Sequence, residues 1–329
     1  MKNKKTKLKL IRFLMLMMVS LSTANASSSS AGGGAAFEDV AEKASHVLTQ
    51  LELIDGFANL GHEWAICAKI NGHFRGEYGY KRDYVVARNY IDGLVYQRNA
   101  IGITKKSGGL FTRHYGYDQN LVAAREFLNY LTEEGNVTSI VLKIEGHAVF
   151  GQQPNAGEAR RLIEELESQG HEQGIVLKIN SLNQGINGFE HNPGEARRLI
   201  EELESQGNER GISLRIYGHA YGYYDYNQDL GEARRLIEEH SIQEGQEGGS
   251  EEITNLKLEG LEYESFGYER NLDAAKGLNE LMIVRGMKSA IENKAKGLVC
   301  GCVESGIYPQ DFAAAARFLK EQQFGLFLK

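Results

Sequence analysis

The fourteen residues GEARRLIEELESQG occur twice in this chain without a change, at Gly157–Gly170 and at Gly194–Gly207, and a partial third copy begins at Gly231. In the first copy the apolar residues follow the i, i+3, i+4, i+7 spacing of one helical face: Ala159, Leu162, Ile163 and Leu166. The final glycine of each copy is typical of a helix C-terminus. The segment therefore predicts a helix that buries a single stripe.

An alanine followed by a basic residue marks this helix in seven places. They are Ala87-Arg88, Ala124-Arg125, Ala159-Arg160, Ala196-Arg197, Ala233-Arg234, Ala275-Lys276 and Ala316-Arg317. The intervals of 37, 35, 37, 37, 42 and 41 residues indicate a solenoid of about seven repeats, because periods of this length are typical of stacked supersecondary units.

The start of the helix is also repeated. Four residues before the alanine stands a good N-cap residue in six repeats: Asp83, Asn120, Asn155, Asn192, Asp229 and Asn271. Glu158, Glu195 and Glu232 follow at N3, where they complete a capping-box pattern. Pro193 occupies the first helical position, where its missing N–H costs nothing. We expect this helix to be the second helix of each repeat.

The first half of each repeat leaves two alternatives open. Segments such as Ile140–Ile144 and Ile175–Ile179, both reading IVLKI, place apolar residues four apart, which favours a helix face; in the last repeat we align Ala295–Val299 with them. Their β-branched residues, and the glycine that usually follows two positions later, favour a strand. Paired helices are the preferred interpretation, and an α/β solenoid of stacked strands is the alternative.

The stretch ICAKINGHFRGEYGYKRDYVVA, Ile66–Ala87, resembles the Sel-one-like repeats, which are related to tetratricopeptide repeats. The matching residues are Ile70, Phe74, Gly76, Gly79, Tyr80, Asp83 and Ala87, and YGYDQNLVAA, NGFEHNPGEA and FGYERNLDAA echo the second half of the pattern. The resemblance extends over about residues 62–329. It implies an all-α, right-handed α-solenoid of antiparallel helix pairs that binds other proteins, including roles in envelope assembly and host contact.

The N-terminus has the three parts of a secretory signal peptide: a basic stretch, a short apolar run and a small-residue cleavage site at Ala24–Ala26. We expect residues 1–26 to be removed, 27–36 to be a flexible linker, 37–61 to hold a capping helix around Phe37–Leu51, and 62–329 to form the solenoid. The mature protein is then secreted or periplasmic, without stable membrane insertion.

Removing residues 1–26 takes away six basic residues and no acidic one, which leaves 31 basic against 44 acidic residues and a net charge of −13. This balance argues against binding nucleic acid, because such binding depends on neutralising phosphates. The three cysteines, Cys67, Cys300 and Cys302, match neither a disulfide framework nor a zinc signature, so we expect free thiols.

Six successive repeats carry a basic residue before the second apolar anchor of the first half: Lys69, Lys106, Lys143, Lys178, Arg215 and Lys257. One hypothesis is a cationic stripe that binds an acidic peptide, glycan or other anionic partner. The alternative is that each cation pairs with a neighbouring glutamate or lays its stem over apolar surface.

Tyrosines cluster in the loop before each second helix. Tyr80, Tyr117, Tyr226 and Tyr268 share one repeat position, so we expect them to pack between helices. One loop has three further tyrosines, Tyr221, Tyr223 and Tyr224, which packing between helices does not require. Because tyrosine is a common interface anchor, we predict that these three residues contact a partner.

His73, His147 and His219 also share a repeat position, but alternate repeats stack too far apart for a shared zinc ion, so we expect packing residues rather than a metal site. No phosphate loop, nucleophile elbow or zinc-protease motif is present, and we expect no cofactor. The sequence thus predicts an exported, non-enzymatic scaffold or adaptor that binds a protein or peptide, including an acidic one, on its concave face and tyrosine-rich loops. The alternative is an enzyme, or a subunit of one, in glycan or peptidoglycan turnover.

Overall fold

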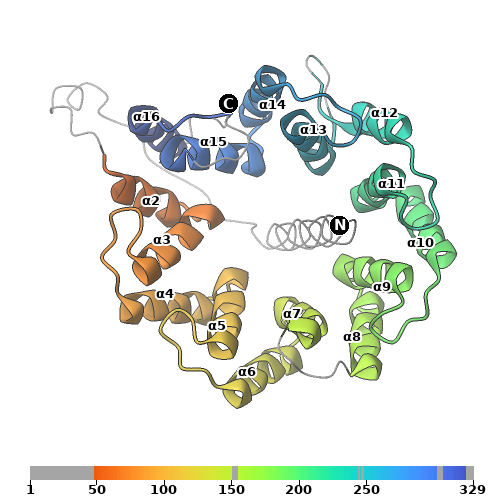
Figure 1. Cartoon of the computed structure of the whole chain (residues 1–329), viewed down its shortest axis with the longest axis horizontal. Coiled ribbons are helices and arrows are strands. Elements are labelled where there is room, and N and C mark those ends of the chain that lie inside the picture. Colours follow the sequence, from red (N-terminus) through yellow and green to blue (C-terminus); the bar gives the residue numbers. More distant parts are fainter. Residues whose placement is uncertain (1–47, 150–154, 244, 246–247, 302–306, 324–329) are drawn as a thin grey trace, which may run out of the picture. The chain divides into compact units, whose positions relative to one another are not determined.

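The computed structural model describes residues 48–149, 155–243, 245, 248–301 and 307–323. The expected signal peptide, the linker and most of the entry helix fall on residues 1–47 and so lie outside the described residues. All regular structure within the described residues is helical, in the fifteen helices α2–α16 of Figure 1. The IVLKI segments are therefore helical, and the strand alternative is wrong for them.

The first helices of the repeats are α3 (Glu63–Arg75), α5 (Ala100–Thr112), α7 (Val137–Val149), α9 (Glu172–Gln184), α11 (Glu209–Tyr221), α13 (Glu251–Tyr263) and α15 (Lys288–Cys300). The second helices are α4 (Tyr84–Tyr96), α6 (Leu121–Glu133), α8 (Ala156–Ser168), α10 (Pro193–Ser205), α12 (Leu230–His240), α14 (Leu272–Val284) and α16 (Phe312–Gln323). The helix α2 (Gln50–Asn59) precedes them.

The second helices begin as their sequence predicts. Side chains of five expected N-caps accept a hydrogen bond from the N3 backbone N–H at 2.9–3.1 Å: Asn120, Asn155, Asn192, Asp229 and Asn271. The capping-box return bond is not formed in α10 and α12, where the N-cap N–H groups of Asn192 and Asp229 donate to the carbonyls of Leu182 and His219. The N3 carboxylates of Glu195 and Glu232 are bound instead by Arg198 and Arg235. The caps are confirmed.

Glycines inside the first helices, which favoured a strand, are explained by packing. A Cβ on Gly72, Gly109, Gly218 or Gly260 would stand 2.4–2.6 Å from the ring of the tyrosine that ends the same repeat's loop. These tyrosines are Tyr80, Tyr117, Tyr226 and Tyr268, each 6–8 % exposed. The glycine therefore leaves room for a buried aromatic ring, and the free energy gained by packing that ring outweighs the low helix propensity of glycine.

The last repeat has a different register from the one that the sequence predicted. In α16 the buried alanine is Ala315, four residues after Asp311, which caps the helix through Ala314 N–H, and Ala316 is half-buried. In α15 the residue that corresponds to first-helix cations such as Lys69 is Lys294. It lies just before the segment Ala295–Val299, which the sequence aligned with the IVLKI segments. The helix boundaries, set by packing, decide this register.

The described residues form two compact units, one of residues 84–142 and the other of residues 48–83 together with the described residues from 143 onward. In the first unit α4 packs on α5 and α5 on α6. In the second unit α9, α11, α13 and α15 form one layer and α10, α12, α14 and α16 form the other (Figure 1). The helix α7 begins in the first unit and ends in the second.

Polar side chains at the start of the first helices join successive repeats of the second unit. Arg210 on α11 binds Glu172 on α9 at 3.4 Å and Glu252 on α13 at 2.6 Å. Ser289 on α15 donates to Glu251 on α13 at 2.7 Å. These links fix the spacing between neighbouring first helices.

The same ladder continues from α15 to α3, although about 225 residues separate them in sequence. Lys288 lies 3.3 Å from Glu63, and the backbone N–H of Glu63 donates to Glu292 at 3.4 Å. The helix α2 packs on α15 and α16, where Gln50 donates to the carbonyl of Val299. The first and last described helices of the second unit are thus held by the same kind of contact as neighbouring repeats.

His62 lies at the contact between α3 and α15, and its burial predicts that the protein loses stability in acid. Its side chain is 8 % exposed, its Nδ1 has no hydrogen-bond partner among the described residues, and its ring packs edge-on against Phe57. Burial, and secondarily the charge of Lys288, lower the pKa of His62 from 6.5 to about 4. The folded state therefore favours neutral His62, and stability that is complete above pH 6.5 is lost as the pH falls toward 4.

We expect the free energy of unfolding of the wild type to fall by up to about 3 kcal/mol more than that of His62→Gln between pH 7 and pH 4. Burial raises the pKa of the neighbouring Glu292, which acts in the opposite direction in both proteins, so the difference isolates His62. Urea denaturation at a series of pH values measures it. Parallel pH profiles of the two proteins would contradict the assignment.

Candidate functional site

Each of the six predicted first-helix cations contacts a carboxylate. The pairs are Lys69–Asp55 (2.8 Å), Lys106–Asp92 (2.8 Å), Lys143–Glu158 (2.6 Å), Lys178–Glu167 (2.8 Å), Arg215–Glu204 (2.8 Å) and Lys257–Glu238 (2.6 Å). The cationic side chains are only 19–29 % exposed. Their positive charges are therefore largely neutralised inside the protein.

In several repeats the buried tyrosine completes a three-residue link. The hydroxyls of Tyr80, Tyr117 and Tyr268 donate to Asp55, Asp92 and Glu238 at 2.7–2.8 Å, so one carboxylate holds both a cation and a phenol. Burial, together with the neighbouring carboxylate, raises the pKa of Tyr117 and Tyr268 far above the usual value. These phenols stay protonated donors, and the link ties two helices and a loop.

The last described repeat contains the same link, which the sequence reasoning missed. Lys294 lies 2.8 Å from Glu280, and the hydroxyl of Tyr308 donates to the same carboxylate at 3.0 Å. The signal was present, because Lys294 stands three residues before Gly297 just as Lys69 stands three residues before Gly72. The misplaced alignment at Ala295–Val299 hid it.

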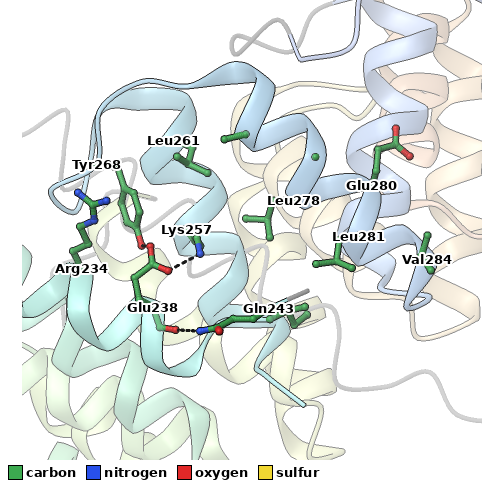
Figure 2. A pocket seen from close by; sticks show the side chains of 13 residues that line it. Arg234, Glu238, Gln243, Lys257, Leu261, Tyr268, Leu278, Glu280, Leu281 and Val284 are labelled. Carbon is green, nitrogen blue, oxygen red and sulfur yellow. Dashed lines mark hydrogen bonds and ion pairs between the residues drawn. The ribbon is translucent and has the colours of Figure 1, made fainter. Parts of the chain in front are cut away.

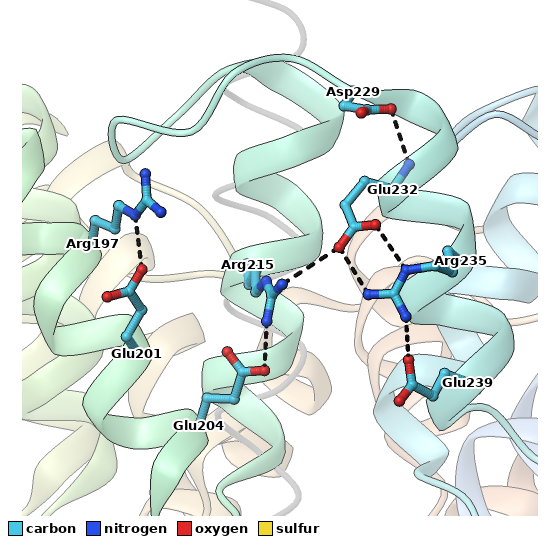
Figure 3. A network of polar contacts seen from close by, with 8 residues as sticks. All are labelled: Arg197, Glu201, Glu204, Arg215, Asp229, Glu232, Arg235 and Glu239. Atoms are coloured by element: carbon cyan, nitrogen blue, oxygen red, sulfur yellow. Dashed lines mark hydrogen bonds and ion pairs between the residues drawn. The ribbon is translucent and has the colours of Figure 1, made fainter.

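Arg215 is the centre of a wider network, shown in Figure 3. Its guanidinium binds Glu204 of α10 at 2.8 Å and Glu232 of α12 at 3.4 Å. Glu232 also accepts from Arg235 on its own helix, and this hydrogen-bonded pairing lowers the pKa of Glu232. Arg215 thus connects the second helices on its two sides, so it has a structural role in addition to any role in binding.

The predicted contact tyrosines separate into two environments. Tyr221 and Tyr223 are half-buried, with ring centroids 5.8 Å apart, and Tyr217 stacks on Tyr221 at 6.0 Å with an interplanar angle of 21°. Burial, followed by the charge of Glu259, raises the pKa of Tyr221 to about 12. Together, Tyr217, Tyr221 and Tyr223 form what we call the tyrosine surface.

Tyr224, in contrast, is 1 % exposed. Its hydroxyl donates to Asn180 of α9 at 2.7 Å and its backbone N–H donates to Asn183 at 2.9 Å. Phe266 occupies the equivalent place in the next loop and packs edge-on against Tyr217 and Tyr221 of α11. Tyr224 and Phe266 therefore serve one purpose, the insertion of a loop residue against the first helix of the preceding repeat.

The histidines of the shared repeat position also contact a ring. His73 lies 4.7 Å from the ring of Tyr80, and His219 lies 4.9 Å from that of Tyr226. The side chain of His147 lies outside the described residues. Within the part of the chain that the structure describes, no three His, Cys, Asp or Glu side chains are grouped so that they could hold a metal ion.

A half-buried carboxyl group on α7, that of Glu145, has a pKa shifted toward neutrality. Burial raises the pKa of Glu145 to about 7, and its Oε2 has no hydrogen-bond partner among the described residues. A carboxyl group of this kind can act as a general acid when a second functional group faces it. The described residues supply no such arrangement around Glu145, so this group alone does not build a catalytic site.

Helices of the described ranges are too short and too polar to include a candidate membrane span.

Comparison with known proteins gave matches only at the level of structure. No family model matches this sequence, and no curated protein matches it. A Sel1 repeat protein from Oxalobacter formigenes is 16 % identical, with a TM-score of 0.37, over 70 % of this chain and 95 % of that one. A protective antigen of uropathogenic Escherichia coli strains that displays an SLR fold is 14 % identical, with a TM-score of 0.35, over 80 % of this chain and 55 % of that one. Within its described residues the chain is a helical repeat protein, and the solved structures to which it is similar are Sel1-repeat and SLR-fold proteins.

Proposed function

We propose that this protein is an exported scaffold that binds a protein or peptide partner through the tyrosine surface. The observation that carries the proposal is that Tyr217, Tyr221 and Tyr223 form one contiguous, partly exposed set of rings, in addition to the Tyr226 ring that packs on Gly218 of the same repeat. Tyrosine combines a large apolar ring with a polar hydroxyl and loses little conformational entropy on binding, which suits it to protein contacts. Envelope assembly and host contact are the settings we propose for an exported chain of this kind.

In this proposal the first-helix cations stabilise the fold and do not bind the partner. An acidic partner would have to compete with a carboxylate that already lies 2.6–2.8 Å from each cation. A partner that uses aromatic and neutral polar contacts avoids this competition. We therefore propose that Lys69, Lys106, Lys143, Lys178, Arg215 and Lys257 hold the repeats together, and that partner binding does not depend on their charge.

The experiment starts with the mature chain from Ser27, used to capture partners from an envelope fraction and from host-cell lysate. A captured protein is then titrated against variants. We expect Tyr221→Ala with Tyr223→Ala to weaken binding at least tenfold, since hot-spot tyrosines each contribute more than about 1 kcal/mol. Tyr96→Ala is the matched control, because Tyr96 is a 90 % exposed tyrosine on α4 that does not belong to the tyrosine surface.

A charge swap tests the cations without breaking their ion pair. Lys178→Glu combined with Glu167→Lys keeps an attractive pair between α8 and α9 while it reverses both charges. We expect unchanged affinity in the swapped protein. Equal binding by the double-tyrosine variant would refute the tyrosine surface, and lost binding in the swapped protein would restore the acidic-partner hypothesis.

A further inference from the structure

The helix α14 differs from α8, α10 and α12 at two outward positions. Six and ten residues after the N-cap, α8, α10 and α12 carry i, i+4 ion pairs: Arg161–Glu165, Arg198–Glu202 and Arg235–Glu239. At the same two steps α14 has Gly277 and Leu281. A charged, solvated strip has therefore become apolar in one repeat.

These residues border an open groove between α14 and the α12–α13 pair, with a volume of about 790 Å³ (Figure 2). Leu278, Leu281 and Val284 of α14 lie along one wall, and Leu261 of α13 lies opposite. Val284 is 71 % exposed. Such apolar exposure with a polar rim marks an interaction site more often than a random surface.

The groove lies where α12 is shorter, and its connection to the next helix longer, than in the neighbouring repeats. The helix α12 has 11 residues where α8, α10 and α14 have 13, and ten residues separate its last residue, His240, from the start of α13 at Glu251. The tight turn that joins α10 to α11 through Gln206–Asn208 is therefore absent from this joint. The two residues by which α12 is shorter amount to about half a helical turn, and Ile242 and Gln243, which follow the helix, line the groove.

The charged residues of the groove are already paired. Glu238 binds Lys257 at 2.6 Å and accepts from Tyr268 at 2.8 Å, while the guanidinium of Arg234 lies 4.8 Å from the Tyr268 ring centroid. Glu280 is held by Lys294 at 2.8 Å. A charged occupant would lose its hydration without gaining a counter-ion, whereas apolar side chains lose nothing by entering.

Gly277 leaves the surface of α14 open to close approach along this groove. Elsewhere in this protein a glycine marks the closest approach of two helices: a Cβ on Gly174 or Gly211 would meet the backbone of the preceding helix at 2.4–2.6 Å. Gly174 and Gly211 lie in the first turn of their helices, whereas Gly277 lies in the middle of α14, and no described atom lies within 4 Å of its Cβ position. It offers a helix the same close approach, on a face that no described helix occupies.

We infer that this groove binds the apolar face of an amphipathic helix from a partner protein. Ala274, Gly277, Leu278, Leu281 and Val284 extend over about 15 Å of α14, which matches about three turns of a bound helix. The groove is neutral, so the helix contributes aliphatic or aromatic side chains to it and keeps its charges at the rim. This is a second binding site, and it does not depend on the tyrosine surface.

The repeat itself provides the variant that tests the site. Gly277→Arg with Leu281→Glu restores in α14 the ion pair that α10 and α12 carry, so the fold is expected to be retained and circular dichroism to be unchanged. The probe is a fluorescein-labelled 18-residue helical peptide with a leucine stripe at i, i+4, i+7 and i+11. A peptide of the same composition without the stripe is the control.

We expect the wild type to raise the anisotropy of the striped peptide at micromolar concentration, the Gly277→Arg/Leu281→Glu variant to bind at least tenfold more weakly, and the double-tyrosine variant to bind as the wild type does. No binding by the wild type, equal binding by the variant, or equal binding of the unstriped peptide overturns the inference. Light scattering adds a further outcome: a wild-type dimer that becomes monomeric in the variant would assign the groove to a second copy of this chain instead.

Discussion

Replacing Tyr224 by alanine is expected to lower the free energy of unfolding by about 3–5 kcal/mol, the usual cost of removing a fully buried aromatic side chain. The ring is 1 % exposed, and its loss leaves a cavity between the α11–α12 loop and α9. It also leaves the Oδ1 of Asn180 without its phenol donor. Chemical denaturation followed by circular dichroism measures the effect.

Tyr224→Phe is the matched control, because it keeps the ring and removes only the hydroxyl. We expect a cost of about 1–2 kcal/mol, from the hydrogen bond to Asn180 and the buried acceptor that remains. Tyr223→Ala is expected to change stability far less, since Tyr223 is only half-buried. If Tyr224→Ala were as stable as wild type but deficient in partner binding, Tyr224 would belong to the contact surface after all.

Gly174→Ala is expected to cost about 2–3 kcal/mol even though alanine is the better helix former. The new Cβ would stand 2.4 Å from the backbone N of Glu167 and 2.7 Å from the carbonyl carbon of Leu166. Backbone atoms cannot rotate away, so α8 and α9 must separate and their buried side chains lose contact. Thermal and denaturant unfolding both report the change.

Gly93→Ala on α4 provides the comparison for Gly174→Ala. Gly93 is exposed within a helix, and no described atom lies within 4 Å of its Cβ position. We expect this variant to be more stable than the wild type by up to about 1 kcal/mol, as helix propensity alone predicts. A stabilising effect at both glycines would show that α8 and α9 do not approach as closely as described.

The sequence predicted the second helices well because their information is local. An N-cap such as Asn192, a proline at the first position and the stripe of Ala196, Leu199 and Ile200 all lie within one helix. The first helices were harder, because Gly72 or Gly218 inside a helix makes sense only once the ring of Tyr80 or Tyr226 is seen against it. The reason for each glycine lies eight residues away, across a loop.

The surroundings of the candidate binding residues could be predicted less well, for the same physical reason. The repeat period predicts the column of cations, and ion pairing within the protein is the alternative to partner binding. No pattern in the chain, however, says which carboxylate reaches which cation. Lys178 pairs backward with α8, whereas Lys143 pairs forward with α8. Tyr223 and Tyr224 are neighbours in sequence, yet their different burial depends on Asn180 and Asn183 of α9.

The sequence by itself determined a chain of tandem helices with defined starts and stops, because caps, glycines and apolar periodicity act over a single turn or helix. The tertiary structure alone decided which cations are neutralised, which tyrosine is buried, and that α14 leaves an apolar groove beside a shortened α12. It also joined α15 to α3 across about 225 residues. Such features depend on distances between helices, and side chains from separate repeats set those distances only once the chain has folded.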